Sequence, residues 1–196
     1  MSGKMIEREF RIDQKDREII THIIENPEIS QHKIAEKIGL TQPSVAMRLK
    51  KLKKMGAIEK QCGIAPTKLG LHIAKVEVVT TDTEELINRF IDCPYFLNGF
   101  ITSGKKNVCL LFAGEEIPTL EAIVNGHIRP LEEVVSVEFN IIISTVKELI
   151  TPIKMHIKRV KKQPCGIKTE CKDCSLYKND RCLGCPAIGQ YKGNFW

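Results

Sequence analysis

The 196-residue chain lacks the long apolar segments that mark membrane and secreted proteins. No stretch approaches the roughly 20 consecutive apolar residues that span a bilayer. The opening residues MSGKMIEREFRID contain no apolar run of the kind found in secretory signals. We therefore expect a cytoplasmic protein with no membrane partner. Apolar residues make up 42% of the chain, which is enough to build a hydrophobic core.

The motifs of common enzymes are absent as well. The sequence contains no glycine-rich phosphate loop, no nucleophile elbow and no His-Glu-x-x-His zinc helix. The five histidines are dispersed along the chain. The Cys-x3-Cys-x2-Cys loop of radical enzymes is missing, and 196 residues are too few for the large barrel that carries it. We expect that the chain is not an enzyme; an electron-transfer or enzymatic iron–sulfur protein is an alternative.

Negative charge is scarce in two segments that hold most of the excess positive charge. The formal net charge is +6, and the segments RLKKLKK (48–54) and KMHIKRVKK (154–162) each contain five basic residues and no acidic one. Such a distribution favours contact with a long polyanion, although many basic runs are only solvated surfaces.

The first part of the chain has the pattern of a helix-turn-helix. Asp13 is a possible N-cap for a helix with a stripe of isoleucines, and Ser30 can cap a second, short helix that Gly39 ends. Thr41 then caps a third helix with one apolar edge and a basic outer side. A helix of this kind fits the major groove of duplex DNA.

We predict a DNA-binding surface on this third helix. Its first residues reach base edges, and lysines further along neutralise phosphates. The expected contacts are Thr41 at the helix start, Gln42, Ser44 and Arg48 as base readers, and Lys50, Lys51 and Lys54 as phosphate contacts. The alternative is a three-helix bundle with a charged surface that binds nothing.

The middle of the chain alternates strand and helix patterns in the order βαββαβ. We expect strands within 71–80, 95–104, 105–114 and 134–145, and helices within 83–91 and 115–128. Ser103-Gly104-Lys105 is typical of a hairpin turn. This order predicts the split βαβ plan, four antiparallel strands with both helices on one face. Because the other face must be covered, we expect a homodimer through the sheets.

The combined pattern resembles the Lrp/AsnC, or feast/famine, transcriptional regulators over residues 12–150. The opening D-x-x-D-x-x-I-I, the segment LTQPSVAMR and the IAPTKLG linker occur in the family's order. The resemblance implies an N-terminal DNA-binding domain, dimers and often octamers, and a small-molecule effector, commonly an amino acid, at the αβ domain. One segment departs from the family: many members have Gly-x-Tyr-Asp where this chain has Gly104-Lys105-Lys106-Asn107-Val108.

Cysteine is concentrated near the end of the chain. The segment PCGIKTECKDCSLYKNDRCLGCP (164–186) holds five of the eight cysteines. Two Cys-x-x-Cys pairs can each direct two sulfurs to one point, and the spacing suits a tetrahedral metal or a cubic cluster. The predicted ligands are Cys171, Cys174, Cys182 and Cys185, with Cys165 as a fifth thiol that could replace one of them.

The identity of the metal is left open between two candidates. The fifth thiol, the Cys-Pro ending and the nearby aromatics Tyr177, Tyr191, Phe195 and Trp196 favour an iron–sulfur cluster of the [4Fe–4S] type. A structural zinc site is the alternative, because four thiolates can stabilise a segment with almost no core of its own.

Together these patterns predict an α+β protein in five parts. They are a winged or plain helix-turn-helix domain (1–62), a linker (63–70), a ferredoxin-like βαββαβ domain of the ACT/RAM type (71–150), a basic linker or arm (151–163) and a cysteine-rich metal module (164–196). The predicted function is a sequence-specific regulator that binds double-stranded DNA and responds to redox state or to iron and sulfur status. An Lrp/AsnC-type regulator with a purely structural zinc site is the alternative.

Overall fold

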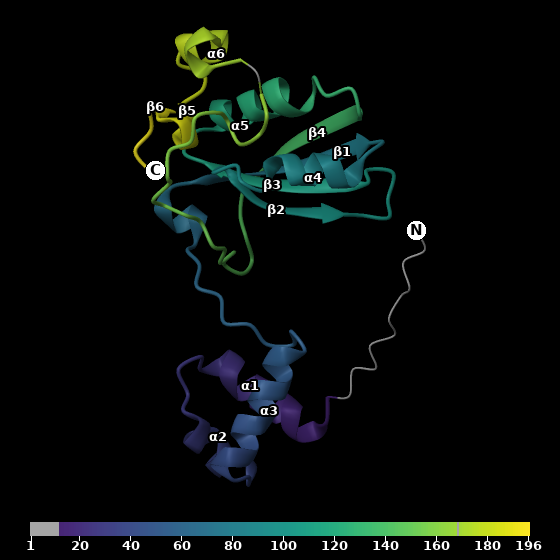
Figure 1. Cartoon of the computed structure of the whole chain (residues 1–196), viewed down its shortest axis with the longest axis vertical. Helices are drawn as coiled ribbons and strands as arrows, with labels where there is room; N and C mark the ends of the chain where they lie inside the picture. The colour runs from purple at the N-terminus through teal and green to yellow at the C-terminus, as the bar shows by residue number, and fades with distance from the viewer. Residues whose placement is uncertain (1–11, 168) are drawn as a thin grey trace. The chain divides into compact units, whose positions relative to one another are not determined.

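The computed structural model describes residues 12–167 and 169–196, which form two compact units divided between Gln61 and Cys62 (Figure 1). The first unit is helical. The second unit is α+β and includes the cysteine-rich tail. Among the described residues no helix is long and apolar enough to cross a membrane.

The first unit consists of helices α1 (Gln14–Glu25), α2 (Gln31–Ile38) and α3 (Gln42–Lys54). Each predicted N-cap is confirmed: Asp13, Ser30 and Thr41 accept hydrogen bonds from backbone N–H groups in the first turns of α1, α2 and α3. Gly39 ends α2 with a positive φ of 67°, a conformation that glycine adopts without strain. These caps produce the expected helix-turn-helix.

A small apolar core holds the three helices together. Ile19 of α1, Ile34 of α2 and Val45 of α3 are almost completely buried against one another. Residues 12–61 contain no strand, so the β wing that the sequence allowed is not present in this part of the chain.

The second unit contains a four-stranded antiparallel sheet in the order β2-β3-β1-β4. The strands are β1 (His72–Thr80), β2 (Phe96–Ile101), β3 (Val108–Gly114) and β4 (Val134–Ile142), and the helices are α4 (Thr83–Phe90) and α5 (Ile117–Ile123), which continues into the π-helical turn η2 (Val124–Ile128). The predicted βαββαβ order and the hairpin between β2 and β3 are therefore confirmed.

Both helices pack on the same face of the sheet. Val76 lies between Leu110 and Phe139 in the strand register, and all three side chains belong to one core together with Phe90 of α4 and Leu120 of α5. The predicted one-sided helix layer is thus observed.

The open face of the sheet is mixed rather than apolar. Glu77 and Glu138 stand opposite each other on β1 and β4, and their charges are balanced by Lys75, 2.9 Å from Glu77, and by Lys106, which contacts Glu138. Exposed apolar side chains such as Phe100 lie on the edge strand β2. The expected dimer through this face therefore stays a prediction, and a partner copy there must match ion pairs as well as apolar side chains.

The cysteine-rich tail folds onto the αβ domain. It contains the short elements η3 (Cys171–Asp173), α6 (Ser175–Lys178), β5 (Gly184–Cys185), η4 (Pro186–Ile188) and β6 (Gln190–Tyr191). Cys165 is 3% exposed and belongs to the core of the αβ domain, with Tyr191 and Trp196 packed against that core. The tail is thus an integral part of the second unit.

The basic segment that joins the sheet to the tail is exposed and irregular. Near its start, Thr151 forms a β-bridge with Ile64. Near its end, the Val160 N–H donates a hydrogen bond of 2.8 Å to the Ala187 carbonyl. The lysines between these points remain accessible, as expected for a basic arm.

Candidate nucleic-acid interface and metal centre

Helix α3 presents one accessible side formed by Gln42, Met47, Lys50 and Lys54. The spacing of three to four residues places the last three of these on one face of the helix. Val45, Leu49 and Leu52 are buried on the other side. The buried leucine and valine edge therefore fixes which lysines point away from the domain.

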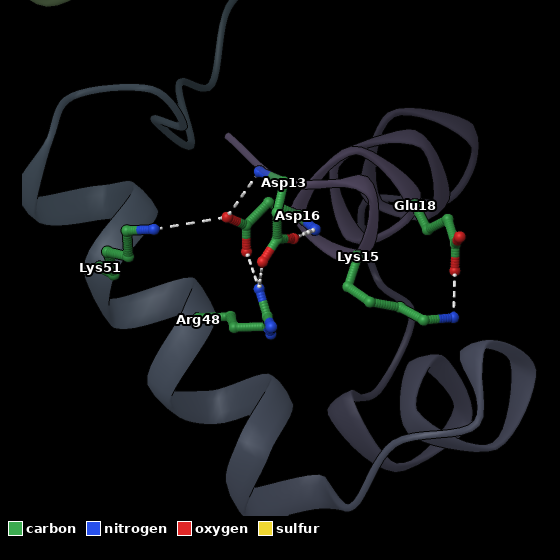
Figure 2. A network of polar contacts seen from close by, with 6 residues as sticks. All are labelled: Asp13, Lys15, Asp16, Glu18, Arg48 and Lys51. Atoms are coloured by element: carbon green, nitrogen blue, oxygen red, sulfur yellow. Dashed lines mark hydrogen bonds and ion pairs between the residues drawn. The ribbon is translucent and has the colours of Figure 1, made fainter. Parts of the chain in front are cut away.

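Arg48 does not share this accessible side. Its guanidinium donates hydrogen bonds to Asp13 over 2.6 Å and to Asp16 over 2.7 Å, as Figure 2 shows. Asp16 is completely buried and also lies 3.5 Å from the ammonium group of Lys51. Two of the residues predicted to contact DNA thus belong to an intramolecular ion-pair network.

This network joins the start of α1 to the middle of α3. Asp13 and Asp16 form a capping box, in which each carboxylate accepts from the other residue's backbone N–H. The hydrogen bond from Arg48 lowers the pKa of Asp13, so this carboxylate loses its charge only at a pH below its usual range. Arg48 therefore fixes the position of α3 within the domain.

The seven predicted DNA contacts consequently divide into three groups. Thr41, Gln42, Lys50 and Lys54 are exposed, Ser44 is half-buried beside the Thr41 cap, and Arg48 and the exposed Lys51 form ion pairs with α1. Met47, with 71% of its surface exposed, was not among the predicted contacts. Met47 could have been predicted as a DNA contact because it is an apolar residue on the basic side of this helix. Apolar side chains in such a position contact thymine methyl groups.

The predicted metal ligands gather around one cavity in the second unit. All five tail cysteines, Cys165, Cys171, Cys174, Cys182 and Cys185, line it. The cavity measures about 180 Å³, well above the roughly 10–15 Å³ needed for one water molecule. No cysteine among the described residues is in a disulfide. Sulfurs from both Cys-x-x-Cys pairs are therefore accessible from one enclosed space.

Two opposing effects act on these thiols. Burial raises the pKa of Cys185 to about 11, while hydrogen bonds from the backbone N–H groups of Ala187 and Ile188 lower it. Burial likewise raises the pKa of Cys182, against a 3.4 Å hydrogen bond from the Gly184 N–H. Burial thus favours the protonated form of Cys182 and Cys185, while backbone donors are in place that stabilise the thiolate form of each.

The donor set fits a thiophilic metal in its chemistry. A soft sulfur environment suits zinc or iron–sulfur clusters. However, among residues 12–167 and 169–196 no three or more His, Cys, Asp or Glu side chains are spaced to hold an ion. Binding of one ion by both pairs would therefore require a rearrangement of the cysteine side chains.

The αβ domain supplies part of the cavity wall. Cys93, Tyr95 and His127 line it opposite the tail. The Nδ1 atom of His127 lies 3.3 Å from Sγ of Cys165, and burial lowers the pKa of this histidine to about 4, so its ring is neutral at pH 7. The dispersed positions of these three residues in the sequence gave no sign of this proximity.

The four aromatic residues of the tail occupy two different places. Tyr177 lines the cavity. Trp196 instead packs on Tyr95 with a ring separation of 4.8 Å and is flanked by Tyr191 and Phe195. Trp196, Tyr191 and Phe195 attach the end of the chain to the αβ domain and are not among the residues that line the cavity.

Comparisons with known proteins agree with this architecture. Residues 12–59 match the family model described as winged helix-turn-helix DNA-binding. Among solved structures, AsnC of E. coli superimposes with a TM-score of 0.61 at 17% identity, covering 70% of this chain and 96% of AsnC. LrpC of B. subtilis gives 0.60 at 23%, covering 70% and 98%. The chain has the Lrp/AsnC fold.

Two curated relatives of this Lrp/AsnC-fold chain are regulators by name. An uncharacterized HTH-type transcriptional regulator of Pyrococcus horikoshii is 26% identical over 143 residues, which are 70% of this chain and 96% of that protein. The proline dehydrogenase transcriptional activator of Rhodobacter capsulatus is 36% identical over 76 residues, 38% of this chain and 49% of the activator. The family-model match supports a DNA-binding helix-turn-helix in residues 12–59, and both of these relatives are named as transcriptional regulators rather than as enzymes.

The ion-pair network gives a direct prediction about the first unit. Asp16→Asn keeps the size of the buried side chain but removes the charge that faces Arg48 and Lys51. We expect a loss of about 2 kcal/mol in the free energy of unfolding, within the range for hydrogen bonds to charged groups. Amide hydrogen exchange in α1 and α3 measures this loss.

Glu18→Gln is the matched control, because Glu18 pairs with Lys15 at the surface of the same helix (Figure 2). Because this ion pair is only partly buried, its loss should change the exchange rates far less than Asp16→Asn does. Equal exchange rates in the Asp16→Asn variant and the wild type would show that the network does not hold α3 in place.

Proposed function

We propose that the protein is a DNA-binding transcriptional regulator of the Lrp/AsnC type whose cysteine cavity holds a [4Fe–4S] cluster that controls DNA affinity. The single observation that carries the proposal is the convergence of both Cys-x-x-Cys pairs and Cys165 on one buried cavity. A cavity lined by thiols, rather than a surface loop, is what an oxygen-sensitive cluster requires.

The DNA-binding part of the proposal is supported by the accessible side of α3. Gln42 lies in the first turn, where side chains reach base edges, and Lys50 and Lys54 lie further along, where they meet phosphates. Met47 adds an apolar contact surface between them. We assign Arg48 to positioning of α3, because two carboxylates hold its guanidinium.

The assembly part of the proposal is a homodimer or higher homo-oligomer. A palindromic DNA site requires two recognition helices, and a two-fold dimer supplies them. A solved regulator from Neisseria meningitidis with a similar fold, at 17% identity and a TM-score of 0.58 over 70% of this chain and 93% of that chain, is described as a complex with L-Met. A small-molecule effector at the αβ domain is therefore part of the proposal.

Regulation requires a free-energy coupling between metal and DNA. A cluster bound in the cavity supplies a centre that oxidants, or a shortage of iron or sulfur, alter or remove. The centre changes transcription only if its presence changes the free energy of DNA binding, and about 1.4 kcal/mol of coupling gives a tenfold change in affinity.

Substitutions on α3 test the DNA-binding surface. Gln42→Ala should weaken binding to the specific site by roughly 5–150-fold, the range for one base-reading contact, and leave nonspecific binding almost unchanged. Lys54→Ala should weaken binding to all sequences equally and reduce the salt dependence by about one counterion. Fluorescence anisotropy with specific and random duplexes at several salt concentrations measures both effects.

Arg17→Ala serves as the control, because Arg17 is an exposed basic residue on α1 and not on α3. It should leave the specificity ratio unchanged. If Gln42→Ala leaves the affinity for the specific site unchanged, and Lys54→Ala leaves the affinity for all duplexes and its salt dependence unchanged, α3 is not the recognition helix.

Anaerobic purification tests the metal centre. We expect about four iron and four sulfide per chain with broad absorbance near 400 nm. Cys182→Ser and Cys185→Ser should lose both, whereas Cys62→Ser, an exposed cysteine outside the cavity, should retain them. Stoichiometric zinc in colourless protein would contradict the iron–sulfur cluster and support a structural zinc site instead.

A further inference from the structure

The two Cys-x-x-Cys turns differ in what holds them. The second turn, Cys182-Leu183-Gly184-Cys185, is attached to the αβ domain by both of its inner residues. The Leu183 N–H donates to the Thr119 hydroxyl over 2.9 Å, and the Tyr95 hydroxyl donates to the Gly184 carbonyl over 2.5 Å. Thr119 is 0% exposed and Tyr95 is 3% exposed, so water competes little for these hydrogen bonds.

Close packing fixes the conformation of this second turn. Gly184 has φ of +87°, and a Cβ atom there would lie 1.9 Å from the Gln190 carbonyl oxygen and 2.6 Å from the Tyr177 ring. The short hairpin of β5 and β6 pairs Gly184 with Tyr191 and Cys185 with Gln190. Only glycine fits, and the backbone has one conformation in which the Gly184 N–H points at the Cys182 sulfur.

The first turn, Cys171-Lys172-Asp173-Cys174, has no such attachment. Its inner residues are exposed, and its hydrogen bonds run within the turn and to the tail, as from the Lys172 N–H to the Gln190 side chain. Within the described part of the chain, no hydrogen bond joins this turn to residues 62–150. A hydrogen bond from the Cys185 backbone to the Cys171 thiol connects it to the second turn, so the tail holds the first turn and the αβ domain holds the second.

We propose that Thr119 and Tyr95 are positioning residues that hold the second turn in place for metal binding, while the first turn is positioned by the tail alone. Thr119 lies in α5 and Tyr95 directly precedes β2. A metal held by Cys182 and Cys185 is thus coupled through two buried hydrogen bonds to the helix layer and the sheet of the αβ domain. This inference rests on the proposed metal centre.

The test uses the full chain and two probes, zinc alone and iron with sulfide under anaerobic conditions. Thr119→Val removes the acceptor with little change in shape, and Tyr95→Phe removes the donor. Each variant should release metal to a chelator roughly tenfold faster than the wild type, the effect of about one hydrogen bond. In the wild type, metal loading should slow amide exchange in α5, and in Thr119→Val this slowing should be lost.

Two further variants separate positioning from general loss of folding. Thr119→Ser keeps the hydroxyl and should restore slow release and the α5 exchange response. Thr151→Val alters another buried threonine of the same unit, one whose backbone pairs with Ile64, and should have no effect on release.

The outcomes distinguish this inference from the metal centre itself. A wild-type protein that takes up neither zinc nor iron overturns both. A wild-type protein that binds metal, with Thr119→Val and Tyr95→Phe variants that release it at the wild-type rate and an α5 exchange rate unaffected by loading, overturns the positioning role alone.

Discussion

The attachment of the tail to the αβ domain is the constraint on which the cysteine cavity depends. The tail has few apolar residues of its own, and a segment of this length cannot bury enough surface to fold alone. Cys165 enters the core of the αβ domain, and Trp196 packs on Tyr95 at the other end of the tail. The cavity exists because these two anchors hold the thiols against a surface that is already folded.

A second constraint acts in the first unit, where one buried carboxylate organises the recognition helix. The Asp16 carboxylate completes the capping box of α1 and at the same time binds Arg48 of α3. A buried carboxylate without a partner is costly, so the arginine has to remain with it. Gln42, Lys50 and Lys54 are therefore accessible to DNA, whereas Arg48 stabilises the packing of α3 on α1.

The sequence was sufficient to predict features that depend on local chemistry. N-caps at Asp13, Ser30 and Thr41 and the left-handed Gly39 follow from short-range hydrogen bonding and sterics, and strand alternation follows from burial on one face. Features that depend on distant pairs were not predictable in this way. The Arg48 to Asp16 ion pair spans 32 positions, and the contact between Cys165 and His127 spans 38.

The same distinction applies to the cysteine site. The spacing of the two Cys-x-x-Cys pairs predicted a shared centre, and all five thiols do line one cavity. The metal itself is still a prediction, and nothing in the spacing pointed to Thr119 or Tyr95. Their role depends on how the tail crosses α5 and the start of β2, which is a property of the tertiary structure alone.

In the proposed function, the state of the cysteine cavity sets DNA affinity. The most direct measurement is the dissociation constant for a duplex carrying the promoter of the protein's own gene, determined at fixed salt for metal-loaded and chelator-stripped protein. We expect the two dissociation constants to differ tenfold or more, and this difference to vanish in the Cys182→Ser variant. Equal dissociation constants for the loaded and stripped wild-type protein would contradict it.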